Sequence, residues 1–229
     1  EKSFVQPSTA FTNSVDILFV ADTSGSMDED LDRVASGVDS FVAALPTNLD
    51  YQIAVMLAHG SRSPHSGKLY KKGPNPYVLS NKTMSVSTIR EYLRNNLVSA
   101  DEDVDADGEE GLYSFYRGLV GGSLQSSKAH GFFRSDAALA VIFISDENGI
   151  CYATDRKNDR EAAIRVRDCS GITAQTVYDR AKSYIGNKPL IFGAIVNTNK
   201  NTLSSGPGND EEYGYGYMNL IQLSNGIAE

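Results

Sequence analysis

The sequence predicts an α/β fold, a Rossmann-like, doubly wound and mostly parallel sheet flanked by helices. Short apolar runs alternate along the whole chain with segments in which apolar residues recur at helical spacing. The runs are nearly continuous, as in parallel strands that are buried on both faces. Regular alternation of strand and helix is the pattern of a sheet built from crossover connections.

Four apolar runs are the expected strands of this sheet. They lie at residues 15–21, 51–58, 137–145 and 190–196, with further short strands expected at 68–71 and 227–229. Between them, the spacing predicts helices at residues 28–45, 86–97, 112–124, 173–185 and 217–223. In the first helix Leu31, Val34 and Val38 share one face, and Pro46 ends it.

We expect a single domain over residues 1–229, with an extension at 1–13 and an insertion at 151–169. The chain shows no repeat, linker or break in composition. The last expected strand is short, so we expect the chain to be part of a larger protein.

Composition excludes some classes of function. Apolar residues make up 41% of the chain, which is enough for a hydrophobic core. The net charge of −8 argues against binding to nucleic-acid phosphates. No apolar run is long enough to span a membrane.

The chain contains two cysteines, Cys151 and Cys169. They enclose a polar insertion, and a disulfide across a loop of this length contributes roughly 3 kcal/mol of stability. We expect this disulfide, which implies an oxidising compartment. Two free thiols are the alternative, and they would favour an intracellular protein.

Two of the expected strands end in an acidic residue. The strand at 15–21 runs into Asp22, followed by Ser24 and Ser26, and the strand at 137–145 runs into Asp146. Ligands bind at the carboxyl ends of parallel strands. If these strands are neighbours, their carboxylates and hydroxyls converge as hard oxygen donors that suit Mg²⁺ or Mn²⁺, with Ca²⁺ a further candidate. Alternatively, Asp22 and the serines only cap the following helix.

The stretch VDILFVADTSGSM resembles the first strand and metal loop of von Willebrand factor A domains. That family carries Asp-x-Ser-x-Ser at a metal-ion-dependent adhesion site, which Asp22, Ser24 and Ser26 match. AVIFISDENG resembles a later strand of the family and makes Asp146 the second carboxylate. YMNLIQLSNGIAE resembles the last helix and the start of the final strand. The resemblance covers nearly the whole chain.

One feature departs from the family. The middle metal loop usually supplies a Thr, whereas the corresponding stretch here, DADGEEGLYSFYRGL, has none. Glu109 or Glu110 would then be a metal ligand and make the site net negative, or both stay outside the first coordination sphere.

Other polar residues have two interpretations each. Asp103, Asp105 and Asp107 match the first half of an EF-hand calcium loop, but Ser114 stands where its last Glu is required, so a solvated acidic loop is the alternative. The tyrosines of 213–217 either form an exposed recognition surface or pack the loop onto the last helix. His59 is interpreted as a surface or loop residue.

The resemblance implies a binding domain and not an enzyme. Its metal would accept an oxygen or acidic group from a protein or glycan ligand, and loops at 59–76, 151–169 and 197–215 would set specificity. The expected location is extracellular, at a bacterial cell surface or periplasmic. A structural scaffold with a closed metal site is the alternative, and a metal-dependent hydrolase would need a general base that none of the three histidines is placed to supply.

Overall fold

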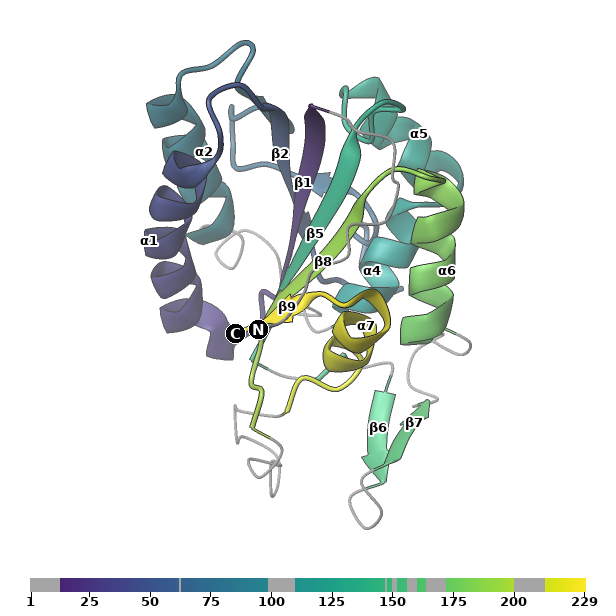
Figure 1. The fold of residues 1–229 in the computed structure, drawn as a ribbon. Coiled ribbons are helices and arrows are strands. Elements are labelled where there is room, and N and C mark those ends of the chain that lie inside the picture. Colours follow the sequence, from purple (N-terminus) through teal and green to yellow (C-terminus); the bar gives the residue numbers. More distant parts are fainter. Residues whose placement is uncertain are drawn as a thin grey trace, which may run out of the picture.

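The computed structural model describes residues 13–61, 63–98, 110–146, 148–149, 152–155, 160–163, 172–199 and 213–229. Its strands are β1 (Ser14–Ala21), β2 (Asp50–Leu57), β3 (Leu69–Tyr70), β4 (Leu79–Ser80), β5 (Ala138–Ile144), β6 (Tyr152–Asp155), β7 (Arg160–Ala163), β8 (Leu190–Ile195) and β9 (Ile227–Ala228). Its helices are η1 (Gly25–Met27), α1 (Asp28–Ala44), α2 (Val86–Val98), α4 (Gly111–Gly118), α5 (Gly121–Ala129), α6 (Ala174–Ile185) and α7 (Tyr217–Ser224) (Figure 1).

The central sheet confirms the predicted fold class. Its strands follow the order β3-β2-β1-β5-β8-β9, and β4 also pairs with β2. Neighbours from β2 to β9 run parallel, whereas β3 and β4 run antiparallel to β2. The four predicted apolar strands therefore form the core of the sheet, with β1 at its centre.

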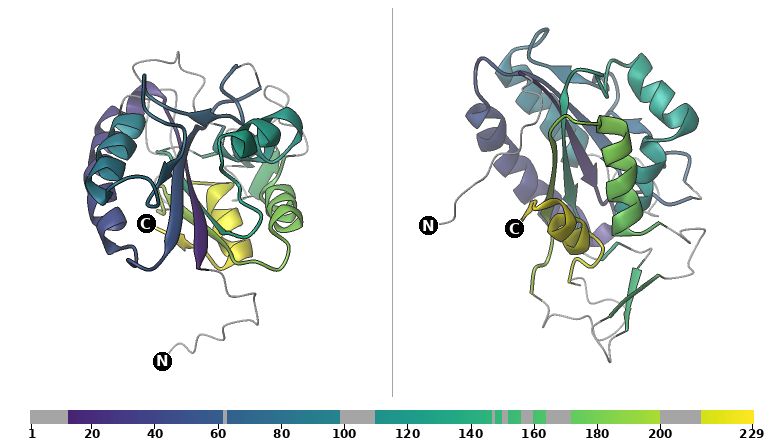
Figure 2. Two further views of the ribbon diagram at one scale, coloured as in Figure 1. Left: turned by 90° about the horizontal axis from the view of Figure 1, so that it is seen from above. Right: turned by 45° about the vertical axis from the view of Figure 1, so that its right-hand side comes forward.

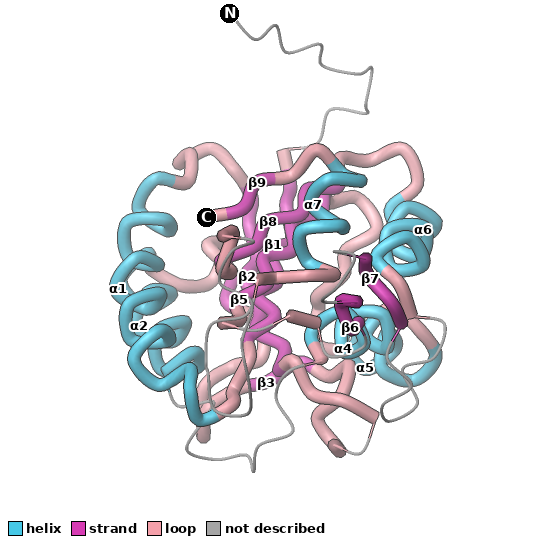
Figure 3. The backbone as a smooth tube through the Cα atoms, turned by 90° about the horizontal axis from the view of Figure 1, so that it is seen from below, coloured by secondary structure: helices cyan, strands magenta, loops and turns pink. Residues whose placement is uncertain are grey.

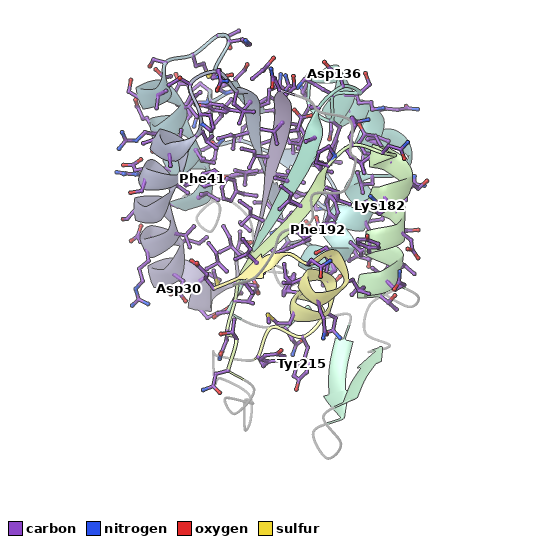
Figure 4. The ribbon with its side chains drawn as sticks, in the orientation of Figure 1. Asp30, Phe41, Asp136, Lys182, Phe192 and Tyr215 are labelled. Atoms are coloured by element: carbon purple, nitrogen blue, oxygen red, sulfur yellow. The ribbon has the colours of Figure 1, made fainter. Side chains whose placement is uncertain are left out.

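Helices cover both faces of this sheet. Helices α1 and α2 lie on one face, and α4, α5, α6 and α7 lie on the other (Figure 2). Side chains alternate along β1 accordingly, since Phe19 packs towards α1 and Leu18 belongs to the opposite core cluster. Phe41 of α1 and Phe192 of β8 lie on opposite sides of the sheet in the same way (Figure 4).

Three details differ from the sequence expectation. The helix expected at 112–124 is divided into α4 and α5, with Gly121 at a positive φ of 52° where α5 begins. Strand β4 was not expected. Within the insertion, β6 and β7 pair as an antiparallel two-stranded sheet separate from the central one. These strands are only two to four residues long, too short for a clear apolar pattern.

None of the helices in the described part of the chain is both long enough and apolar enough to cross a membrane.

Candidate metal-binding site

The two acid-ended strands are neighbours, as the predicted site requires. β1 and β5 pair in parallel, with Ala21 opposite Ile144. The next residue continues the ladder, because the backbone N–H of Asp22 donates to the carbonyl of Ile144 at 2.9 Å. Asp22 and Asp146 therefore leave the sheet at the same edge, which is the edge seen in Figure 3.

Asp22 is fully buried and held by two hydrogen bonds. Its Oδ1 accepts from the backbone N–H of Ser24 at 2.9 Å, and its Oδ2 accepts from the hydroxyl of Ser145 at 2.6 Å. The pKa of Asp22 is raised to about 7, because burial and, to a lesser degree, the charge of Asp146 outweigh the hydrogen bonds from Ser145 and Ser24 that lower it. A cation beside these carboxylates would favour their ionised forms.

The two serines present their hydroxyls side by side. The Oγ atoms of Ser24 and Ser26 are 3.1 Å apart, and a tight turn forms where the N–H of Met27 donates to the carbonyl of Ser24 at 3.0 Å. The alternative capping role is wrong for α1. Its N-cap residue is Met27, and no side chain makes a capping hydrogen bond there.

Asp146 is the second residue after β5 and is 9% exposed. Together with Asp22, Ser24 and Ser26 it supplies two carboxylates and two hydroxyls, all hard oxygen donors from two adjacent strand ends. This donor set fits Mg²⁺ or Mn²⁺, which accept carboxylate oxygens and retain water.

Glu110 lies near the same edge but comes from a third segment. It is 1% exposed, and its backbone N–H donates to the carbonyl of Ala58 at 2.6 Å. Its carboxyl lies against Gly60, where an added Cβ would come within 2.1 Å of Oε2. Among the described residues, no three His, Cys, Asp or Glu side chains form a group that could hold a metal. A ligand role for Glu110 stays a prediction.

His59 lies in the loop after β2, which agrees with one of its two interpretations, a surface or a loop residue. The surface position is wrong, because its side chain is buried. Nε2 is 2.9 Å from the hydroxyl of Thr23, and Nδ1 is 2.7 Å from the hydroxyl of Ser63. His59 thus connects the loop that follows β1, through Thr23, to Ser63 in its own loop after β2.

Sequence reasoning also missed Thr23 and Ser145 as supports of the site. Both are buried and hydrogen-bonded beside the predicted ligands. The available signal was their position, since Thr23 lies inside the Asp-x-Ser-x-Ser stretch and Ser145 directly precedes Asp146.

The tyrosines of 213–217 pack inwards, which supports the second interpretation of this segment. Tyr213, Tyr215 and Tyr217 are all buried. The hydroxyl of Tyr217 accepts a hydrogen bond from the N–H of Gly111 at 3.2 Å, so α7 contacts the start of α4.

Three predictions fall outside the described residues. They concern Glu109 as a ligand, the calcium loop at Asp103 to Asp107, and the disulfide between Cys151 and Cys169. The disulfide and the calcium site therefore stay predictions.

Neither protein-family models nor curated protein sequences give a match to this chain. Similar solved structures include a von Willebrand factor type A protein from Catenulispora acidiphila, with 15% identity, a TM-score of 0.45, and coverage of 95% of this chain and 38% of that one. The PilB minor pilin from Streptococcus sanguinis has 14% identity and a TM-score of 0.45, with coverage of 96% and 57%.

The pilus adhesin SpaC from Lactobacillus rhamnosus GG has 15% identity and a TM-score of 0.45, with coverage of 94% of this chain and 28% of the adhesin. This chain therefore spans less than two thirds of the length of each of these proteins. Similarities this distant carry no functional argument.

Proposed function

We propose that this chain is a metal-dependent binding domain of an adhesion or surface-assembly protein. One observation carries the proposal: Asp22, Ser24 and Ser26 leave β1 at the same sheet edge at which Asp146 leaves the adjacent β5. A rigid parallel sheet holds these oxygen donors in place, while the loops around them are free to differ.

The residues have distinct roles in this proposal. Ser24 and Ser26 would bind a divalent cation directly through Oγ, and Asp22 and Asp146 would bind it through water. Two carboxylates balance the charge of such a cation. A protein or glycan oxygen, foremost an acidic side chain, would complete an octahedral coordination. The protein would act at a cell surface or in another extracytoplasmic compartment, as part of a larger chain.

Titration calorimetry with Mg²⁺, Mn²⁺ and Ca²⁺ tests the metal site. We expect the wild type to bind and the Ser24→Ala/Ser26→Ala variant to lose binding by at least tenfold. Ser85→Ala/Ser87→Ala is a matched control, because these exposed serines are also two residues apart with hydroxyls 2.8 Å from each other. A wild type that binds no divalent ion would refute the proposal.

The alternative function, a structural scaffold with a closed site, is favoured by the buried Glu110 close to this edge. In a closed site, Mn²⁺ binds but added acetate does not reach the bound ion, and Glu110→Gln weakens Mn²⁺ binding. In an open site, acetate binds to the Mn²⁺-loaded protein, and Glu110→Gln leaves acetate binding unchanged.

A further inference from the structure

His59 connects two loops at the carboxyl edge of the sheet. It is the second residue after β2, and its side chain is fully buried. Its ring nitrogen Nε2 is 2.9 Å from the hydroxyl of Thr23, and Nδ1 is 2.7 Å from the hydroxyl of Ser63. The backbone N–H of His65 donates to the same Ser63 hydroxyl at 3.1 Å, so the loop after β2 holds the ring from one side. A ring engaged at both nitrogens has a fixed orientation.

Thr23 lies between two of the proposed metal ligands in the loop of residues 22–26. Asp22 precedes it and Ser24 follows it, and the side chain of Thr23 is 0% exposed. A rotation of the backbone at Thr23 would turn the carboxylate of Asp22 relative to the hydroxyl of Ser24. The contact with His59 restricts this rotation, because the buried Thr23 hydroxyl would lose this partner.

Two backbone hydrogen bonds hold the ends of the same loop. The N–H of Asp22 donates to a carbonyl of β5 at 2.9 Å, and the N–H of Met27 donates to the carbonyl of Ser24 at 3.0 Å. Neither bond involves Thr23. The contact between Thr23 and His59 is thus placed to fix the middle of the loop, where the directions of the two flanking side chains are set.

We infer that His59 is a positioning residue: through Thr23 it holds the loop of residues 22–26 in the arrangement that presents its oxygens to a divalent cation. The inference rests on the proposed function and deepens it, since it names a residue that controls metal affinity without contacting the metal. Replacing a residue that orients metal ligands typically weakens metal binding about 10–100-fold. We expect about tenfold here, because His59 acts through the backbone of the loop and not on a ligand atom.

Two amide side chains separate the two contacts of His59. The amide nitrogen of Gln lies as many bonds from Cβ as Nε2 of His, so His59→Gln can keep the contact with Thr23. The amide nitrogen of Asn matches Nδ1 in the same way, so His59→Asn can keep only the contact with Ser63. Titration calorimetry should give a Kd for Mn²⁺ within about twofold of the wild type for His59→Gln, and a Kd about tenfold weaker for His59→Asn.

Substitutions of Thr23 test the same contact from its other side. Thr23→Val keeps the shape of the side chain but removes the hydroxyl, whereas Thr23→Ser keeps the hydroxyl. We expect Thr23→Val to weaken Mn²⁺ binding as much as His59→Asn, and Thr23→Ser to retain it. The double variant Thr23→Val/His59→Asn should bind no more weakly than either single variant. His130→Asn is the matched control, because His130 is exposed and its ring lies against that of Tyr77.

A metal-free measurement tests the positioning role by itself. In the absence of divalent ions, hydrogen exchange followed by NMR reports on the amide of Ser24, which donates to Oδ1 of Asp22 at 2.9 Å. This amide should exchange about tenfold faster in His59→Asn than in the wild type or His59→Gln, because the loop opens more often once Thr23 is released.

The outcomes separate this inference from the proposed function. Equal Mn²⁺ affinities or equal exchange rates in the wild type and His59→Asn would overturn the inference and leave the metal site intact. Equal losses in His59→Asn and His59→Gln would also overturn it, because the role would then be general packing. If His59→Asn does not fold, Thr23→Val and Thr23→Ser give the same comparison. A wild type that binds no Mn²⁺ would refute the proposed function, and the exchange rates would still decide whether His59 holds the loop.

Discussion

At the scale of single residues, buried polar groups hold the loop of residues 22–26 in place. Asp22 accepts hydrogen bonds from Ser145 and Ser24, and Thr23 is bonded to His59. A buried polar group without a partner costs about 1–3 kcal/mol, so these bonds restrict the loop to one conformation. His59 shows the limit of sequence reasoning, because its partner Thr23 is 36 positions away and no local pattern indicates the contact.

Asp22 should make the metal-free protein less stable as the pH rises. Burial raises the pKa of Asp22 from 3.8 to about 7, so its stabilising contribution is complete below pH 3.8 and is lost as the pH rises through 7. Asp22→Asn removes this ionisation. We expect the variant to be more stable than the metal-free wild type at pH 8, by up to about 4 kcal/mol, with the difference shrinking towards pH 5.

Urea unfolding in the presence of a chelator measures this difference at both pH values. Added Mg²⁺ should raise the stability of the wild type at pH 8 more than that of the variant, because the variant lacks one of the two carboxylates of the proposed site. A stability difference that is the same at pH 5 and pH 8 would contradict the assignment of the ionisation to Asp22.

At the scale of elements, the long apolar strands were predictable and the short ones were not. β1, β2, β5 and β8 lie within a residue or two of their predicted ranges, because burial on both faces leaves continuous apolar runs. β4 and the β6–β7 pair depend on their partners for stability, and so their sequences carry little signal. The predicted site requires that β1 and β5 are neighbours in the sheet. The sequence does not give the order of the strands, so only the three-dimensional structure could establish this adjacency.

Gly226 should be essential for seating the last strand. An added Cβ at Gly226 would lie 2.1 Å from the backbone carbonyl oxygen of Phe192, where β9 docks on β8. Gly226→Ala should therefore cost about 1–3 kcal/mol by overpacking. Gly193→Ala, in the neighbouring strand, places its Cβ 3.7 Å from the nearest atoms and should be neutral. Equal urea midpoints for the two variants would show that β9 adjusts freely.

At the scale of the whole molecule, the two ends of the parallel strands differ in their residues. The carboxyl ends of the strands carry the candidate site, whereas Arg134 connects neighbouring strands near their amino ends. Its Nε donates to Asp16 at 2.7 Å, and its Nη1 donates to Asp50 at 2.9 Å. These bonds join the start of β1, the start of β2 and the segment before β5. Burial raises the pKa of Asp16 and the hydrogen bonds from Arg134 lower it, so the carboxylate depends on this partner.

Arg134→Ala should destabilise the fold without weakening metal binding. The substitution leaves the Asp16 carboxylate, 1% exposed, without its cation, and breaking such a buried pair costs about 3–5 kcal/mol. Arg33→Ala breaks an ion pair of similar length, 3.0 Å, at the surface, and should cost about 0–1 kcal/mol. Urea unfolding compares the two losses.

Calorimetry of folded Arg134→Ala at low temperature should give the wild-type Kd for Mn²⁺. Arg134 contacts Asp16, which lies six residues before Asp22, so the two ends of β1 are about 20 Å apart at roughly 3.3 Å per residue. Because the sheet is rigid and buried on both faces, the loss of the Arg134 hydrogen bonds should not change the geometry of the candidate site at that distance. A variant that folds but binds Mn²⁺ tenfold more weakly would contradict this division of tasks, because the amino ends of the strands would then control the geometry at their carboxyl ends.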